Sequence, residues 1–125
     1  METSAAVLAL AALAQGTRLS IFRLLVTAGP AGLSVGKIGE AVDANGATLS
    51  FHLKELARAG LVEPRQEGRF IYYSARFEHM NALLHFLTEN CCEGNEAQCR
   101  PAACRPAEQP RKETRETTPR ARRGR

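Results

Sequence analysis

The apolar and polar positions between residues 45 and 74 predict a helix followed directly by a β-hairpin. Leu49, Leu53 and Leu56 recur at the spacing of one helix face, and Gly60 follows as a stop signal. Two runs of strand-like composition come next, residues 61–66 and 69–74, with the turn Glu67-Gly68 between them. A helix that leads straight into a twisted hairpin is the core of a winged helix-turn-helix. In that motif the helix enters the major groove of DNA and the hairpin reaches the flanking backbone.

The rest of the chain predicts further helices on both sides of this stretch. Gly16 separates the first two, Gly29-Pro30 ends the second, and Ser34 is a suitable N-cap for the third. The expected helical spans are residues 4–13, 17–28, 35–43 and 76–90, with residues 31–33 as a loop. The predicted fold is therefore mainly α with a small β-hairpin, a winged helix-turn-helix in the order α-α-α-α-β-β-α.

The first and last of these helices carry more apolar surface than one small domain needs. The first holds Val7, Leu8, Leu10 and Leu13, and the last has a stripe of Phe77, Met80, Leu83, Leu84 and Leu87. Spare apolar surface favours a homodimer in which both helices pack across a two-fold axis. Such a pair would also match a palindromic operator. The alternative is that both helices pack on their own domain.

Placing the three leucines inward turns a polar face of the helix outward. The outward positions are Ala47, Thr48, Phe51, Lys54 and Arg58, with Ser50 and His52 at the boundary. Hydroxyls, an imidazole and an ammonium are suitable donors for base edges and phosphates, and an aromatic ring can contact a thymine methyl. The alternative is an ordinary amphipathic helix with a solvated face.

The charge is unevenly distributed along a chain whose 125 residues are enough for one domain. Residues 105–125 hold eight Lys/Arg and three acids, a net +5, whereas residues 1–104 hold nine and ten, a net −1. The tail has no Leu, Ile, Val, Phe or Tyr, so we expect a disordered basic extension. A dedicated DNA-binding arm is the alternative. DNA affinity of the remaining body must come from a local patch.

The apolar run of residues 5–14 resembles the core of a signal peptide, but no Lys or Arg precedes it and Glu2 does. We interpret it as a packed helix of a cytoplasmic protein that has no membrane partner. The chain also shows no nucleophile–base pair and no phosphate loop, which predicts a non-enzyme with no required cofactor.

The cysteines gather in one short segment, at Cys91, Cys92, Cys99 and Cys104. Clustered thiols without a secretion signal indicate metal or redox chemistry, and a set of thiolates alone selects soft ions. Cys91, Cys92 and Cys99 are the expected ligands of a three-sulfur site, which suits trivalent arsenic or antimony, and Cys104 is less favoured. The predicted organisation is a DNA-binding and dimerisation domain (1–92), a metalloid-binding segment (91–104) and the tail (105–125). The alternative is that the cysteines bind nothing.

Four motifs together resemble the ArsR-type (ArsR/SmtB) repressors, the arsenic- and metal-responsive winged-helix family of bacteria. They are GTRLSIFRLL (16–25), LSFHLKELARAGLV (49–62), EGRFIYYS (67–74) and LTENCC (87–92). The family prototype binds arsenite through cysteines of its third helix, but residues 33–39 here contain no Cys. The chain is similar to the branch whose thiols lie at the end of the last helix. Cys91 and Cys92 match its adjacent pair, and Cys99 matches the third thiol by order.

The resemblance implies a repressor of an arsenic-resistance operon that binds operator DNA and releases it when trivalent arsenic or antimony binds. It also implies DNA contacts from Thr48, Ser50, Phe51, His52 and Lys54 of the reading helix, and from Arg65, Arg69 and Gln66 of the wing.

Three alternatives stay open at this point. One is a sensor of methylarsenite that needs only Cys91 and Cys92, because a monomethyl species has two exchangeable positions. Another is a redox switch in which a disulfide involves Cys99 or Cys104, since adjacent cysteines are strained as a pair. The last is a protein that sequesters arsenic or binds a protein partner and never touches DNA.

Overall fold

The computed structural model describes residues 1–94, which belong to a compact unit of residues 1–89 and to a second unit that begins at Asn90. The first unit contains α1 (Thr3–Leu13), α2 (Gly16–Ala28), β1 (Leu33–Ser34), α3 (Val35–Val42), α4 (Gly46–Arg58), β2 (Val62–Glu67), β3 (Phe70–Ala75) and α5 (Phe77–Thr88). This order confirms the predicted winged helix-turn-helix, with one short strand more than expected. The helix ends lie within two residues of the predicted ones.

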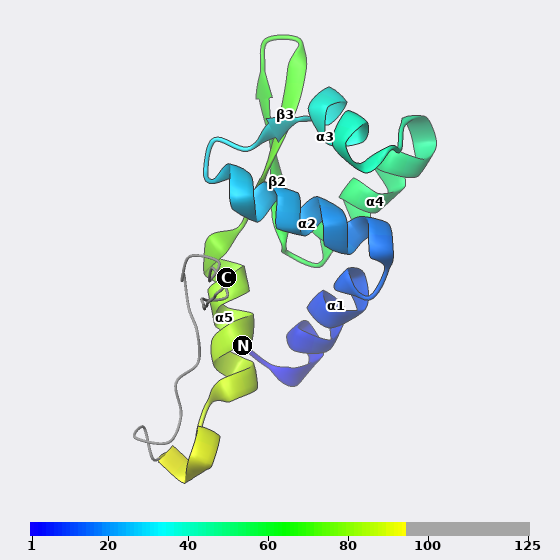
Figure 1. The fold of residues 1–125 in the computed structure, drawn as a ribbon. Helices are drawn as coiled ribbons and strands as arrows, with labels where there is room; N and C mark the ends of the chain where they lie inside the picture. The colour runs from blue at the N-terminus through cyan, green and yellow to red at the C-terminus, as the bar shows by residue number, and fades with distance from the viewer. Residues whose placement is uncertain (95–125) are drawn as a thin grey trace, which may run out of the picture. The chain divides into compact units, whose positions relative to one another are not determined.

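The core of this unit surrounds α2, which packs against α1, α3, α4 and β3 (Figure 1). Its largest fully buried side chains are Ile21, Leu25, Ile38, Leu53, Leu56, Leu61 and Val62. Burying each of these contributes about 1.5–3 kcal/mol. The leucine stripe of α4 is buried as the spacing predicted, with Leu49 completing it. The opposite face of α4 is therefore the one left outside.

The α3–α4 pair is closed by a tight connection. The Ser34 hydroxyl accepts a hydrogen bond from the Lys37 amide at 3.3 Å, which confirms the predicted N-cap. The residue that follows α3, Asp43, is its C-cap and has a left-handed φ of 56°. Gly39 lies so close to the returning chain that a Cβ there would be 2.6 Å from the Ala44 carbonyl oxygen. A glycine at this position lets α4 begin directly beside α3.

The sheet is antiparallel and has the order β1-β3-β2. The segment expected to be a loop supplies β1, because Leu33 pairs with Tyr73 and Ser34 with Tyr72. The hairpin register pairs Glu67 with Phe70, so the turn is Gly68-Arg69 and not Glu67-Gly68. Gly68 takes a φ of +62°, as the first central residue of a type II′ turn requires. Arg69 consequently lies at the tip of the wing.

The terminal helices leave much of their apolar surface exposed, as the sequence predicted, and bury mainly small residues in α1. In α1 the small residues Ala6, Ala9 and Ala12 pack on the domain, and Val7 is 58% exposed. Leu8 and Leu10 are also exposed. In α5 Leu83 is buried, whereas Leu84 and Leu87 are exposed. The predicted single stripe of α5 is therefore split between the core and an outer face.

Within residues 1–94, no helix is both long and apolar enough to cross a membrane by itself. Taken together, α1 and α2 reach the required length and composition, but their axes are bent by 102°.

The second unit is described for residues 90–94, where Cys91–Gly94 forms a short 3₁₀ turn (η1). Asn90, Cys92 and Glu93 all have a positive φ there. Cys99, Cys104 and the predicted basic tail lie outside the described residues.

Candidate DNA-binding surface and cysteine pair

The outer face of α4 carries most of the side chains predicted to read DNA. Thr48, Ser50, Phe51 and Lys54 are all exposed, and Phe51 is 56% exposed. Phe51 adds an apolar ring to an otherwise polar helix face. This face therefore combines hydroxyl donors, a cation and an apolar contact, as base and phosphate recognition requires.

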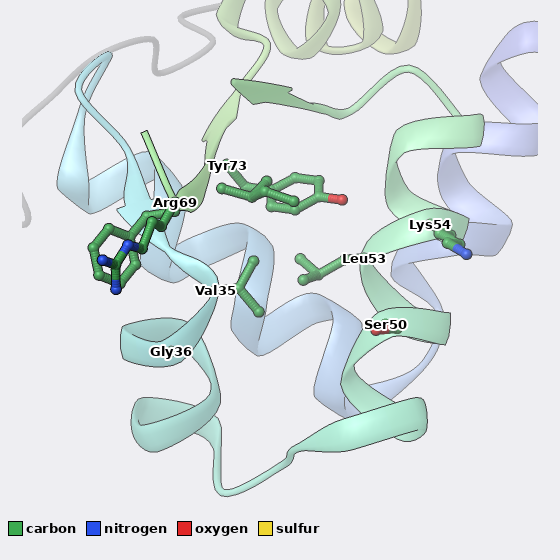
Figure 2. A pocket seen from close by; sticks show the side chains of 9 residues that line it. Val35, Gly36, Ser50, Leu53, Lys54, Arg69 and Tyr73 are labelled. Atoms are coloured by element: carbon green, nitrogen blue, oxygen red, sulfur yellow. The ribbon is translucent and has the colours of Figure 1, made fainter. Parts of the chain in front are cut away.

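A cleft of about 400 Å³ separates this face from the wing (Figure 2). Its walls come from α3, α4 and β3, and it is lined by Val35, Gly36, Ser50, Leu53, Lys54, Arg69, Phe70, Ile71 and Tyr73. The side chains of Val35 and Leu53 point toward each other, and the Tyr73 ring lies beside them. The structure thus brings Ser50 and Lys54 of the reading helix to the same cleft as Arg69 of the wing.

Arg65 lies on the other face of the hairpin. It is paired with Tyr72, whereas the neighbouring pairs contain Ile71 and Tyr73, which line the cleft. Because side chains alternate between the faces of a strand, Arg65 points away from α4. Its guanidinium donates to Glu67 Oε2 at 2.7 Å and to the Ala31 carbonyl at 3.0 Å. Its Cζ also lies 5.3 Å from the Tyr72 ring centroid. These contacts give Arg65 a role within the wing and do not bring it beside the reading helix.

His52 departs from the sequence-based expectation. It was predicted to contact DNA from the boundary of the outward face, but its side chain is only 8% exposed. The physical reason is a contact that spacing along α4 cannot reveal. His52 Nδ1 lies 3.1 Å from Nη1 of Arg18, a residue of α2. In this structure the imidazole faces the interior, so a direct base contact from His52 is not supported.

At the end of α4, an ion pair with a carboxylate occupies one of the cations that could otherwise contact DNA. Arg58 Nη2 donates to Glu55 Oε1 at 2.6 Å. This hydrogen bond holds the pKa of Glu55 below its usual value, and the Arg58 and Arg18 charges act in the same direction. The same bond raises the pKa of Arg58. Since Arg58 is already engaged with a carboxylate, Lys54 is the better candidate for a phosphate contact.

Sequence reasoning missed two wing residues that the structure places at the cleft. Phe70 is 60% exposed and Ile71 is also exposed, next to Arg69. The shifted turn explains the omission, because the predicted hairpin assigned these residues no particular face. An aromatic residue directly after the basic turn residue was the available signal.

Cys91 and Cys92 lie at the start of the second unit, where both are exposed. Their Sγ atoms are 3.8 Å apart. Within the described residues, no group of three or more His, Cys, Asp or Glu side chains is arranged to hold a metal ion. Any third thiolate must therefore come from Cys99 or Cys104, beyond those residues.

Comparisons with known proteins identify the fold as that of DNA-binding regulators. Residues 13–65 match the family model described as a helix-turn-helix domain. The chain is 31% identical over 95 residues to the transcriptional activator HlyU of Vibrio cholerae, covering 76% of this chain and 85% of HlyU. The structure is similar to that of reduced HlyU, with a TM-score of 0.53 and 34% identity over 68% of this chain and 90% of that one.

Two further proteins are similar to this chain. One is a Mycobacterium bovis protein, described as the homodimeric winged helix-turn-helix DNA-binding domain of a possible ArsR-family transcriptional regulator. Its TM-score is 0.56, with 33% identity over 72% of this chain and 83% of that one. The other is a Staphylococcus aureus homologue of the cadmium resistance regulator CadC, 34% identical over 73 residues, which are 58% of this chain and 59% of the relative.

This chain belongs to the ArsR family. As a member it is a DNA-binding transcriptional regulator and not an enzyme. Membership also counts against the alternative of a sequestering protein that never touches DNA.

Proposed function

We propose that this regulator represses an arsenic-resistance operon and leaves its operator when trivalent arsenic binds Cys91, Cys92 and a third thiolate. Antimony is the closest chemical substitute. The protein acts where the chromosome lies, in the cytoplasm. Repression is part of the proposal, because the relative HlyU is named as an activator.

The proposed DNA-binding form is a homodimer. Val7 of α1 is 58% exposed and Leu87 of α5 is 54% exposed, although both are large apolar side chains on neighbouring helices. Such a patch is costly to leave in water. The M. bovis relative is described as homodimeric, which supports a dimer, and the exposed apolar side chains of α1 and α5 are the surface we assign to it. Two reading helices related by a two-fold axis would then face successive major grooves of a palindromic operator.

The observation that supports the inducer site is the closeness of Cys91 and Cys92, whose Sγ atoms lie 3.8 Å apart. Cys91 is disulfide-bonded in this structure, so the proposed site forms in the reduced protein, where both residues can become thiolates. Two thiolates on one soft ion, at an ion–sulfur distance of about 2.3 Å and a tetrahedral angle, lie about 3.8 Å apart. A pyramidal three-sulfur site needs a slightly smaller separation, which two exposed side chains can reach. Thiolates without hard ligands select thiophilic ions. The CadC homologue, a regulator named for resistance to another soft ion, fits the same chemistry.

The experiment is fluorescence anisotropy on a labelled duplex from the region upstream of the gene, titrated with arsenite. We expect Cys91→Ser and Cys92→Ser to bind the duplex like the wild type and to stay bound at arsenite concentrations that release the wild type. A serine hydroxyl cannot replace a thiolate, because it is harder and far less acidic. Full release of both variants would refute the inducer site.

The other two cysteines identify the third ligand. Cys99→Ser should lose the response to arsenite, and Cys104→Ser should respond like the wild type. Loss of release in Cys104→Ser alone would move the third ligand there. If Cys99→Ser still responds to methylarsenite but not to arsenite, two thiolates suffice for the methylated species.

A redox switch is the second candidate, favoured by the relative HlyU, one of whose structures is described as reduced. In that reading an oxidant such as peroxide removes two electrons and two protons from a cysteine pair and forms a disulfide. The same anisotropy assay separates the candidates. Release by peroxide, reversed by a thiol reductant and without any response to arsenite, would favour the redox switch.

A further inference from the structure

Arg18 lies between the end of α1 and the reading helix α4, and the DNA-binding surface described above does not account for its contacts. It lies in the first turn of α2, where its amide donates to the Gln15 side chain at 2.9 Å. Its Nε donates to the Ala12 carbonyl at 2.7 Å, one of the last carbonyls of α1. These terminal carbonyls have no partner inside their own helix. One branch of the guanidinium therefore caps the end of α1.

The other branch reaches the reading helix. Arg18 Nη1 lies 3.1 Å from Nδ1 of His52. A guanidinium carries donors and no acceptor, so the contact is a hydrogen bond only if Nδ1 presents its lone pair. His52 must then be neutral and carry its proton on Nε2. A protonated imidazole would lose the bond and put two cations in contact.

The same guanidinium also touches the outer face of α4. Arg18 Cζ lies 5.9 Å from the ring centroid of Phe51, and the Phe51 and His52 rings are 5.6 Å apart. Arg18 thus meets a buried and an exposed side chain that are adjacent on the helix expected to enter the groove. Glu55, one turn further along α4, is the carboxylate close enough for the Arg18 charge to lower its pKa, together with the stronger effect of Arg58.

We propose that Arg18 is a positioning residue for DNA recognition, which ties the end of α1 to His52 and so fixes the rotation of α4 about its axis. The leucine stripe of α4 decides which face of the helix is buried, but apolar contacts alone leave room for small rotations. A hydrogen bond does have one. With α4 fixed, Ser50, Phe51 and Lys54 face the DNA together. His52 then acts on DNA through Arg18 and not by touching a base.

The binding test compares Arg18→Lys with Arg23→Lys, an exposed arginine on the same helix. Lysine keeps the charge but cannot donate from two planar branches at once. The probes are a duplex that the wild-type protein selects from a random-sequence pool and a scrambled duplex of equal length. We expect Arg18→Lys to lose on the order of tenfold in the ratio of the two affinities. Arg23→Lys should keep the wild-type ratio. An unchanged ratio in Arg18→Lys overturns the proposal.

Two variants of His52 test the partner. Asn and Leu have similar shapes, but the Asn side-chain oxygen lies near the place of Nδ1 and can accept from Arg18. His52→Asn should keep more of the affinity ratio than His52→Leu. The double variant Arg18→Lys/His52→Leu should have an affinity ratio no lower than that of the single variant with the lower ratio, because both changes remove the same contact. If the losses of the two single variants add up in the double variant, the proposed contact between Arg18 and His52 is contradicted.

A measurement on the wild-type protein keeps the proposal testable if a variant does not fold. Long-range ¹H–¹⁵N NMR of the imidazole reports which ring nitrogen carries the proton. We expect Nε2–H in the wild type and a mixture of tautomers in Arg18→Lys, which would report the loss of the contact, whereas the affinity ratio reports its effect on DNA recognition. A wild-type His52 that is protonated on Nδ1 cannot accept from Arg18, and this result alone would refute the inference.

Discussion

Replacing Gly39 by Ala tests how tightly the helix-turn-helix is closed. The added Cβ would lie 2.6 Å from the Ala44 carbonyl oxygen and 3.1 Å from Cδ2 of Leu49. The first neighbour is backbone and cannot rotate away. Gly36, on the same helix, is the matched control, because a Cβ there meets nothing within 4 Å. Neither glycine has a positive φ, so backbone strain does not separate the two variants.

The expected magnitude follows from terms that partly cancel. Both replacements gain about 1 kcal/mol of helix propensity. Overpacking at Gly39 costs about 1–3 kcal/mol in addition. The free energies of unfolding of the two variants should therefore differ by about 1–3 kcal/mol, with Gly36→Ala the more stable. For a domain of this size each kcal/mol moves the melting temperature by about 4–8 °C. Gly39→Ala should melt about 4–24 °C below Gly36→Ala.

The measurement is thermal unfolding followed by circular dichroism, with urea unfolding as a second method. The protomer concentration is kept equal, because the stability of an oligomer depends on it. Gly39→Ala should also bind the selected duplex more weakly, since opening the turn moves α4 away from α3. Equal melting temperatures for the two variants would show that the α3–α4 connection has room which the structure does not show.

Three further predictions concern DNA binding, assembly and the tail. Arg69→Ala should weaken binding to every duplex about equally and lower the salt slope by about one, whereas Ser50→Ala should reduce the preference for the selected duplex. Both are measured by anisotropy at several salt concentrations. Leu87→Glu should shift the protein from dimer to monomer in sedimentation, because a carboxylate would be buried in the apolar patch. Removal of residues 106–125 should leave folding and the arsenite response intact, and a truncated protein that fails to dimerise would contradict this.

The local sequence signals predicted those elements that local rules govern. The period of the α4 leucines, the Ser34 cap and the strand composition after Gly60 each act within one turn or one hairpin. They agree on a single fold, and the comparisons support it. The two-residue strand β1 was missed because its existence depends on pairing with Tyr72 and Tyr73, far along the chain. A run that short carries no period of its own.

The side chains whose positions the sequence could not give depend on contacts between elements. In α1 the alanines are buried in place of the larger Val7 and Leu10, because small residues let two helices approach closely. His52 was expected to face DNA, and a guanidinium 34 residues earlier turned it inward. Arg65 was expected to contact DNA from the wing, and its pairing with Tyr72 puts it on the face of the hairpin away from α4, where that contact stays a prediction. None of these outcomes can be obtained from spacing along one element.

The proposed switch must satisfy a thermodynamic condition that concerns both of its ligands. Arsenic can release the operator only if it binds the DNA-free protein more tightly than the DNA-bound protein. The coupling is reciprocal, so operator DNA must weaken arsenite binding by the same factor, roughly 5- to 150-fold for a typical coupling.

The cysteine pair begins three residues after the last residue of α5, Thr88. α5 carries the exposed Leu84 and Leu87, which we assign to the dimer contact. A thiol-bound ion that changes the end of α5 would therefore act on the spacing of the two reading helices, without touching the face of α4 that meets DNA. For that reason a cysteine variant should lose the response to arsenite while keeping its affinity for the operator.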